Sequence, residues 1–348
     1  MTGATPDVAA SPSEPTGTGP GRAPDARLVV ENVTVEYRTR KGTVHAVTDV
    51  SLDVPRGTTL ALVGESGCGK SSLGRAMLQL PRPTSGRVMV DGTDLCSLSG
   101  AALKRARKSI QMVFQDPVSS LNPRRRVRDI VAEGLEIQGI EGDGAELRRR
   151  VDAAMEAVGL DPASAGDRRP AEFSGGQCQR IALARALVLE PEVLVCDEPV
   201  SALDVSVQAQ ILNLLEDMKA RYRLTMVFIS HDLSVVHNIA DRVAVMYLGT
   251  VCEVADTTAL YRAPAHPYTM LLLSSAPTLG GTLADTLGET PIAATSSELP
   301  SPLNPPSGCR FRTRCPRATA ICTTDRPQLV DIAPGHQVAC HHPLEENR

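Results

Sequence analysis

Short, continuous apolar runs alternate with helix-like segments through the middle of the chain. The runs at residues 59–63, 193–196 and 225–229 each carry at most one polar side chain. Runs of this length are typical of strands buried on both faces of a parallel sheet, because buried helices are usually longer. Strongly helical or amphipathic segments adjoin them, at 179–187 and 205–219. The pattern predicts an α/β fold built on a parallel sheet.

Other patterns occupy the flanking regions. Residues 27–63 alternate apolar and polar side chains in two or three runs, which predicts a small antiparallel sheet laid against the parallel one. Residues 82–98 are predicted to form a hairpin, because Asp91 and Gly92 favour its tight turn. Residues from about 118 to 182 are charged and mostly helical in pattern, so we expect an inserted helical subdomain there.

Composition narrows the class of protein. The chain has 348 residues, 42% hydrophobic and 22% charged, which suits one large globular domain with an appendage. A net charge of −4 gives no reason to expect a nucleic-acid partner. The sequence contains no apolar stretch of about 18 residues, the length that spans a bilayer. Residues 1–26 are rich in small and turn-forming residues and lack the pattern of a signal peptide, so we expect a disordered leader.

A glycine-rich loop lies between the apolar run at 59–63 and a helix-like segment at 73–78. This is the context of a phosphate-binding loop, because glycines let backbone N–H groups turn toward an anion and the helix adds its positive end. Lys70 would reach the β- and γ-phosphates, and the Ser71 hydroxyl would bind Mg²⁺. The chain is therefore predicted to bind a nucleoside triphosphate. The loop residues are Gly64, Glu65, Ser66, Gly67, Cys68, Gly69, Lys70, Ser71 and Ser72.

Acidic and polar side chains end the other predicted strands. Asp197 and Glu198 end one of them, at the sheet edge where ligands bind in parallel sheets. Asp197 can hold Mg²⁺ directly or through water, while Glu198 can polarise an attacking water. Gln115 can contact Mg²⁺ and that water, or it can satisfy backbone groups of its own loop. His231 ends a further strand, within expected reach of a γ-phosphate.

Among the remaining candidates, Tyr37 and the segment near residue 175 each allow two interpretations. Tyr37 could stack on an adenine at about 1 kcal/mol, or it could be a half-buried strand residue. Asp204 ends a tight loop that begins at Ser201 and precedes a helix. A second anion site, or an ordinary helix cap, begins the helical segment near residue 175. Its residues are Ser174, Gly175, Gly176 and Gln177.

Together these residues resemble the ATPase subunit of ABC transporters over about residues 28–260. The resemblance implies a P-loop NTPase (RecA-like) core that binds ATP and Mg²⁺. In that family each ATP lies between the phosphate loop of one subunit and the signature of another, so a second ATPase subunit is implied. The matching motifs are the Walker A loop at 64–71, the Q-loop Gln115, the signature at 174–177, the Walker B Asp197, the catalytic base Glu198, the D-loop ending at Asp204, the switch His231 and the adenine-stacking Tyr37.

Stretches at 115–124, 170–173, 266–269 and 308–316 are similar to the oligopeptide and dipeptide importer branch, which also includes nickel importers. The resemblance implies a subunit at the cytoplasmic face of the membrane. Its implied partners are a second, different ATPase, two permeases and an extracytoplasmic solute-binding protein. Peptides lead as substrate, with nickel and other small solutes as alternatives. A soluble ABC-type ATPase acting on DNA or ribosomes is the alternative from another class, disfavoured by the single cassette and the negative net charge.

The C-terminal region concentrates cysteines at a spacing of C-x5-C-x6-C-x17-C. Four thiolates could hold zinc or a [4Fe–4S] cluster, and likeness to peptide importers favours the cluster. Reduced structural thiols are the alternative, and a redox sensor is a further one. The cysteines are Cys309, Cys315, Cys322 and Cys340, and nearby candidate ligands are His336, His341 and His342. We therefore divide the chain into a leader at 1–26, an ATPase domain at 27–255 and a cysteine-containing extension at 256–348.

Overall fold

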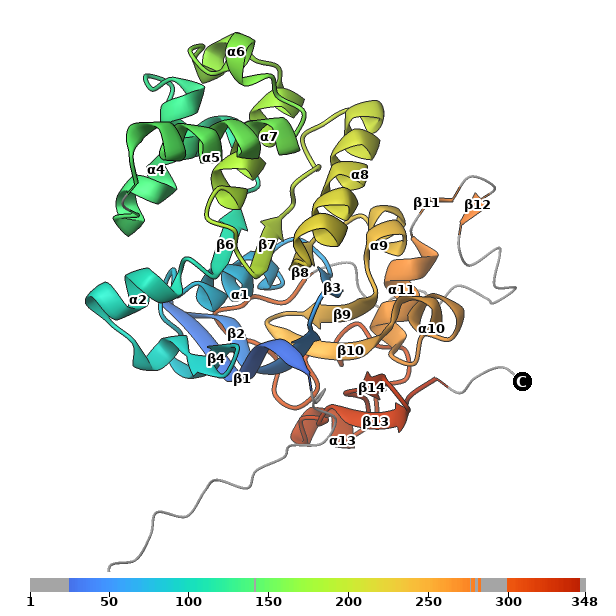
Figure 1. The fold of residues 1–348 in the computed structure, drawn as a ribbon. Helices are drawn as coiled ribbons and strands as arrows, with labels where there is room; N and C mark the ends of the chain where they lie inside the picture. Colours follow the sequence, from blue (N-terminus) through green and yellow to red (C-terminus); the bar gives the residue numbers. More distant parts are fainter. Residues whose placement is uncertain (1–24, 141, 276, 279–280, 283–298, 345–348) are drawn as a thin grey trace, which may run out of the picture.

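A computed structural model describes residues 25–140, 142–275, 277–278, 281–282 and 299–344. Its centre is an eight-stranded sheet in the order β13-β14-β10-β9-β3-β8-β7-β6 (Figure 1). Pairing is parallel from β9 across to β6 and antiparallel from β9 outward to β13. The α/β class predicted from the apolar runs is confirmed. The predicted leader lies outside the described residues except for Asp25 and Ala26.

The strands of this sheet are β3 (Thr59–Val63), β6 (Ile110–Val113), β7 (Val193–Asp197), β8 (Thr225–Ile229), β9 (Arg242–Tyr247), β10 (Thr250–Asp256), β13 (Val330–Ala333) and β14 (His336–Val338). A separate small pair is formed by β11 (Pro277–Thr278) and β12 (Gly281–Thr282). The α-helices are α1 (Lys70–Met77), α2 (Gly100–Ala106), α3 (Pro117–Ser120), α4 (Val127–Gln138), α5 (Gly144–Ala157), α6 (Pro162–Ala165), α7 (Gly175–Leu187), α8 (Val205–Tyr222), α9 (Leu233–Ile239), α10 (Thr257–Arg262), α11 (Pro267–Ser274) and α13 (Ile321–Thr324).

The central strands are buried on both faces. Every residue of β3, β7 and β8 is buried. Alternate side chains enter two different cores, because neighbouring residues of a strand point to opposite faces. Leu60 and Leu62 pack with α1 and an antiparallel sheet, whereas Ala61 and Val63 pack with α7, α8 and α9. Burial on both faces accounts for apolar runs without alternation.

The antiparallel sheet has the order β2-β1-β4-β5. Its strands are β1 (Ala26–Thr39), β2 (Gly42–Pro55), β4 (Ser85–Val90) and β5 (Thr93–Asp94). Asp91 and Gly92 have φ of 48° and 76°, the left-handed values of a tight hairpin turn. The predicted antiparallel sheet and its hairpin are confirmed.

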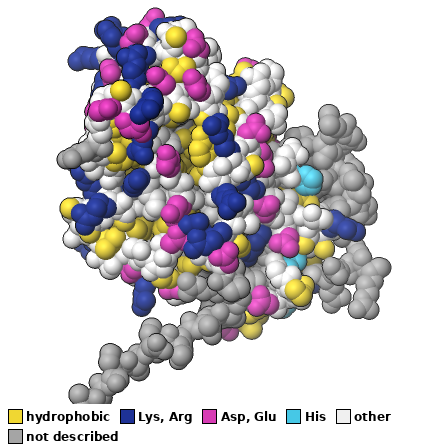
Figure 2. All heavy atoms as spheres, viewed as in Figure 1, with side chains coloured by type: hydrophobic (Ala, Val, Ile, Leu, Met, Phe, Trp, Pro, Cys, Tyr) yellow, Lys and Arg dark blue, Asp and Glu magenta, His cyan; other side chains and the backbone are white. Residues whose placement is uncertain are grey.

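Helices α3 to α7 form a layer that projects from the central sheet (Figure 1). α7 packs against α3, α4 and α5 and also reaches β6, so it links this layer to the sheet. Basic side chains in this layer are paired with acids, as Arg149 and Arg150 are with Glu146. Figure 2 accordingly shows Lys and Arg interspersed with Asp and Glu over this face of the molecule. Such paired surface charges are typical of solvated helices.

The C-terminal extension is continuous with the central sheet, which the sequence did not indicate. β14 pairs with β10, and β13 extends the sheet beyond it. Glu253 of β10 is fully buried and accepts hydrogen bonds from the backbone of Ala265 and His266 at 2.7 and 2.8 Å. His336 of β14 lies 2.7 Å from the same carboxylate. A buried carboxylate with three partners fixes the extension to the sheet.

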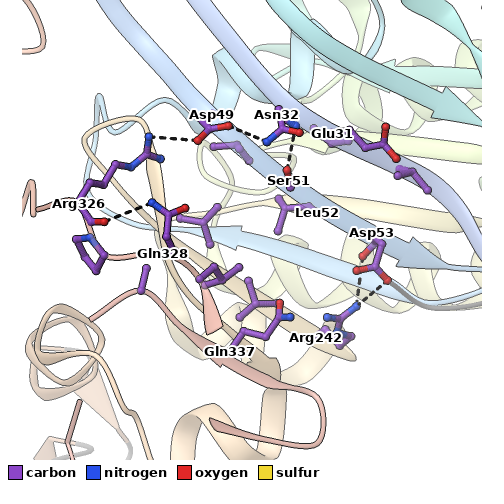
Figure 3. A pocket seen from close by; sticks show the side chains of 18 residues that line it. Glu31, Asn32, Asp49, Ser51, Leu52, Asp53, Arg242, Arg326, Gln328 and Gln337 are labelled. Carbon is purple, nitrogen blue, oxygen red and sulfur yellow. Dashed lines mark hydrogen bonds and ion pairs between the residues drawn. The ribbon is translucent and has the colours of Figure 1, made fainter. Parts of the chain in front are cut away.

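A cavity of about 430 Å³ lies where the extension meets β1 and β2. Figure 3 shows Arg326 of the extension pointing toward Asp49 of β2, with Gln328 beside it. Arg326 also donates to the Thr48 carbonyl at 3.0 Å. On the other side of the cavity Arg242 pairs with Asp53 at 3.4 Å. The extension thus contacts the antiparallel sheet as well as the central one.

Candidate nucleotide site

The glycine-rich loop runs from the end of β3 to the start of α1, as the sequence predicts. Gly64, Gly67 and Gly69 have φ of 145°, 78° and 104°, which other residues rarely adopt. A Cβ added to Gly69 would lie 2.1 Å from the Ala46 carbonyl oxygen of β2. A side chain here would therefore push the loop away from β2.

Lys70 is the first residue of α1 and is 5% exposed. Its Nζ donates to the carbonyls of Gly64 at 2.7 Å and Glu65 at 3.1 Å. The ammonium group therefore lies within the loop, beside the positive N-terminal end of the helix. A buried cation there is placed to bind an anion such as a phosphate.

Ser71 and Asp197 form a contact between the loop and the end of β7. The Ser71 hydroxyl donates to Asp197 Oδ1 at 2.6 Å. Asp197 is fully buried, and burial raises the pKa of its carboxyl although the Ser71 bond opposes this. Its Oδ2 accepts no hydrogen bond from the described residues and lies 3.7 Å from Arg75 Nη2. A hydroxyl beside an under-bonded carboxylate oxygen fits the oxygen ligands that Mg²⁺ takes.

Three candidates from three strand ends converge on one another. Gln115 Nε2 donates to Glu198 Oε2 at 2.9 Å, and His231 Nδ1 lies 3.2 Å from Glu198 Oε1. Glu198 has a φ of 48° and donates its backbone N–H to the Ile229 carbonyl at 3.0 Å. The three side chains therefore meet at the carboxyl edge of the parallel strands, next to Asp197.

The second candidate anion site begins α7. Ser174 is its N-cap and exchanges hydrogen bonds with Gln177, whose side chain accepts from the Ser174 N–H at 2.9 Å. Ser174, Gly175 and Gln177 are exposed. A Cβ on Gly176 would lie 2.5 Å from Val207, so α7 packs closely on the start of α8 there. Both interpretations of this segment, helix cap and anion site, are compatible with an exposed capped N-terminus.

Asp204 and Tyr37 have ordinary local roles in the fold as well. Asp204 is the N-cap of α8 and accepts from the Val207 N–H at 3.0 Å. Hydrogen bonds from Ser206 and Val207 lower the pKa of its carboxyl. Tyr37 is half-buried on β1 opposite Val44 of β2. Adenine stacking by Tyr37 stays a prediction.

Two residues that the sequence did not indicate contact the phosphate loop from outside it. Tyr268 of α11 accepts a hydrogen bond from the Glu65 N–H at 2.9 Å. Arg314 of the extension contacts both carboxylate oxygens of Glu65, at 2.8 and 3.0 Å. Both residues stand in stretches that support the family resemblance, but nothing in their local pattern indicates a partner in the loop.

The four cysteines of the extension line one enclosed space together with His341 and His342. His336 is elsewhere, because it binds Glu253. Burial and the neighbouring thiols raise the pKa of Cys340 to about 12. Within the described part of the chain, no three His, Cys, Asp or Glu side chains are arranged to hold a metal ion. Neither a zinc ion nor an iron–sulfur cluster is therefore shown at these cysteines.

Within the described ranges, no helix is both long and apolar enough to cross a membrane.

Comparisons with known proteins show the family of this chain. Residues 47–201 match the family model of the ABC transporter, and residues 252–322 match that of the oligopeptide/dipeptide transporter C-terminal region. A Brucella ovis protein, assigned by its name to peptide import as an ATP-binding protein, is 50% identical over 90% of this chain and 96% of its own. The oligopeptide transport ATP-binding protein AppF of Bacillus subtilis is 48% identical over 88% of this chain and 92% of its own.

Solved structures show the same fold. The cbiO1 protein of Clostridium perfringens, part of the cbiONQ ABC transporter complex, has a TM-score of 0.61 at 32% identity, covering 68% of this chain and 91% of that one. A dimeric ATP-binding cassette in a post-hydrolysis state, bound to ADP and Pi, also has a TM-score of 0.61, at 28% identity, covering 66% of this chain and 98% of that one. The chain therefore belongs to the ABC transporter family, within its branch of peptide and oligopeptide transport ATP-binding proteins.

Proposed function

We propose that this chain hydrolyses ATP at the edge of the parallel sheet to drive peptide import. The observation that carries the proposal is the convergence of Gln115 and His231 on Glu198, next to the Ser71–Asp197 contact. Lys70 binds the β- and γ-phosphates, while Ser71 and Asp197 hold Mg²⁺. Bound Mg²⁺ supplies charge neutralisation on the phosphates. Identity near 50% to peptide transport ATP-binding proteins supports the assignment of peptides.

Glu198 acts in this proposal as the base that orients or deprotonates water. Gln115 and His231 hold its carboxylate and respond to the γ-phosphate. Glu198→Gln is expected to keep ATP binding and to lower the hydrolysis rate by about 10² to 10⁴-fold, the usual effect of losing a positioned base. Glu156→Gln, on the exposed face of α5, is the matched control. Hydrolysis by Glu198→Gln within about tenfold of wild type would remove Glu198 from this role.

A second ATPase subunit completes each ATP site in this proposal. The Ser174 to Gly176 segment of one subunit binds the γ-phosphate that Lys70 of the other holds. The exposed start of α7 supports this assignment, because Ser174 and Gly175 are accessible to a partner. We propose a different ATPase as the partner, as the likeness to peptide importers implies.

The complete transporter would comprise the two ATPases, two permeases and an extracytoplasmic solute-binding protein, with this chain at the cytoplasmic face of the membrane. Nickel or another small solute remains the alternative substrate. Affinity purification of the tagged chain from gently solubilised membranes tests these partners. Recovery of two permeases and a second ATPase is expected. Recovery of the chain alone, or with ribosomes or DNA, would instead favour a soluble ABC-type ATPase.

We also divide the chain into an ATPase domain at 27–255 and an extension at 256–348. We propose that the cysteine-lined space of this extension holds a [4Fe–4S] cluster. The chemistry of four thiols around one space supports it, since such clusters bind four cysteine thiolates. Iron and acid-labile sulfide are to be measured in the anaerobically purified chain and in a Cys315→Ser variant. Both should be present in the wild type and depleted in the variant. Absence of both from the wild type would leave reduced structural thiols.

A further inference from the structure

We propose that Arg314 of the C-terminal extension is a positioning residue of the ATP site, which orders the phosphate loop through Glu65. The extension is then part of the nucleotide site as well as an appendage to it. This inference rests on the proposed binding of ATP by the loop.

The contact joins two segments that are far apart in the sequence. The Arg314 guanidinium donates to both Glu65 oxygens, Nη1 to Oε2 at 2.8 Å and Nη2 to Oε1 at 3.0 Å. Arg314 is 6% exposed as a residue. The Glu65 side chain is 30% exposed. Two parallel charge-assisted hydrogen bonds from a buried guanidinium are still stronger and more directional than an ordinary surface ion pair.

The surroundings of Arg314 hold its side chain in place. Its guanidinium carbon lies 5.7 Å from the ring centroid of Tyr247 and 5.9 Å from that of Phe311. Tyr247, Phe311 and Tyr268 are fully buried and contact one another edge to face or at a tilt. Stacking on aromatic rings favours a cation and limits its freedom. The arginine is therefore pre-ordered before it meets Glu65.

The same aromatic group reaches the loop a second time. Tyr268, which packs on Phe311, accepts the Glu65 N–H, while the Glu65 carbonyl accepts from Lys70. The side chain, N–H and carbonyl of Glu65 are thus each bound by a different residue. Glu65 immediately precedes the loop residues whose N–H groups would face the phosphates.

The contacts that fix Glu65 should raise the affinity of the loop for ATP. A loop that is ordered beforehand loses less conformational entropy when ATP binds, so its affinity is higher. Glu198 follows strand β7, whereas the phosphate loop follows β3. The chemical step at Glu198 therefore does not depend on the Arg314 contact. Loss of the contact should therefore weaken ATP binding and leave the maximal hydrolysis rate nearly unchanged.

The full-length Arg314→Met variant tests this. Its dissociation constant for ATP should rise about tenfold, as expected for lost hydrogen bonds between charged groups, and its kcat should stay within about threefold of wild type. Arg312→Met is the matched control, because Arg312 lies in the same segment and donates to Ser307. Arg314→Lys should be intermediate, since one ammonium cannot reproduce the two-point contact.

Glu65→Gln tests the pair from the loop side and leaves Arg314 among its aromatic rings. It should weaken ATP binding like Arg314→Met, and the double variant should be no weaker than either single one by more than about twofold. In the wild type, bound ATP should also slow hydrogen exchange at residues 309–315, because coupling between two sites is reciprocal. Glu65→Gln should lose that protection.

An unchanged ATP affinity in Glu65→Gln would overturn the proposal, even if Arg314→Met proved unable to fold. Equal protection of residues 309–315 by ATP in Glu65→Gln and wild type would also overturn it. The assignment of Glu198 fails separately, because it is measured by kcat rather than by affinity.

Discussion

The phosphate loop and the start of α7 are both built to bind an anion, yet they are supported differently. The loop is contacted by Ala46 of β2, Asp197 of β7, Tyr268 of α11 and Arg314 of the extension. At the start of α7, by contrast, Ser174 exchanges hydrogen bonds with its own helix and remains exposed.

The difference corresponds to the two roles proposed for these segments. A loop that binds ATP within its own subunit benefits from being ordered in advance. A segment that meets ATP on another subunit needs its N–H groups free, and its local cap keeps the helix intact meanwhile. Substitutions at the two segments should therefore act on different measurements.

The largest effect is expected at the loop. Lys70→Met removes the buried ammonium and should weaken ATP binding to the isolated chain by about 100-fold or more, because hydrogen bonds between charged groups are lost. Lys104→Met, on the exposed face of α2, is the matched control. Calorimetric titration with ATP and Mg²⁺ measures both. An affinity within about threefold of wild type would show that the loop does not bind the phosphates through Lys70.

The opposite result is expected at the start of α7. Ser174→Arg should leave ATP binding to the isolated chain within about threefold of wild type, but hydrolysis by the assembled transporter should fall about tenfold or more, as when positioned anion donors are lost. Ser99→Arg, at the exposed N-cap of α2, is the control. A similar loss of ATP affinity in both Ser174→Arg and Lys70→Met would show that the two segments do not have different roles.

These two variants also identify the partner. Transporters assembled from a mixture of Lys70→Met and Ser174→Arg chains would contain one intact site if two copies of this chain paired. With a different ATPase as partner, mixing should restore no activity. Partial recovery of hydrolysis in the mixture would therefore replace the proposed heterodimer with a homodimer.

Much of the fold and loop could be predicted because the signals are local. The apolar runs of β3, β7 and β8 need no long-range information, and the glycine spacing of the loop indicates its own turns. The meeting of Gln115, Glu198 and His231 follows from one rule, that parallel strands end at a common edge. The placement of β14 beside β10 does not, because three residues carry too little pattern to indicate a partner strand.

The Glu65–Arg314 contact was unpredictable for a related reason. Its members are separated by 249 residues, and each is a charged residue in a loop whose usual interpretation is a solvated side chain. Their pairing depends on Tyr247, Tyr268 and Phe311, which form one aromatic group only after the extension has folded onto the sheet.

A smaller effect is expected where the loop contacts β7 through Ser71 and Asp197. It separates the binding of ATP and Mg²⁺ from the stability of the fold. Burial raises the pKa of Asp197, so the unfolded chain loses this proton at lower pH than the folded one. Between these two pKa values the folded state binds more protons than the unfolded state. The free energy of unfolding without ATP and Mg²⁺ should therefore fall as pH rises across that interval to the folded pKa. Asp197→Asn should remove that fall and raise the unfolding temperature at neutral pH, while abolishing hydrolysis.

Ser71→Ala should lower the unfolding temperature, because Asp197 loses its hydrogen bond. A lower unfolding temperature in Asp197→Asn would contradict the direction of the shift.

The smallest effects should separate two adjacent glycines at the start of α7. A Cβ on Gly176 would lie 2.5 Å from Val207 Cγ1, so Gly176→Ala should destabilise the isolated chain by about 1–2 kcal/mol through overpacking. A Cβ on Gly175 would lie 3.6 Å from Leu203, an ordinary contact, so Gly175→Ala should leave stability unchanged or slightly higher. Adding Val207→Ala should restore the stability of Gly176→Ala, and denaturant unfolding measures all three. Equal destabilisation by both glycine substitutions would mean that Gly175 is packed too, and that the start of α7 is less open to a partner than its exposure indicates.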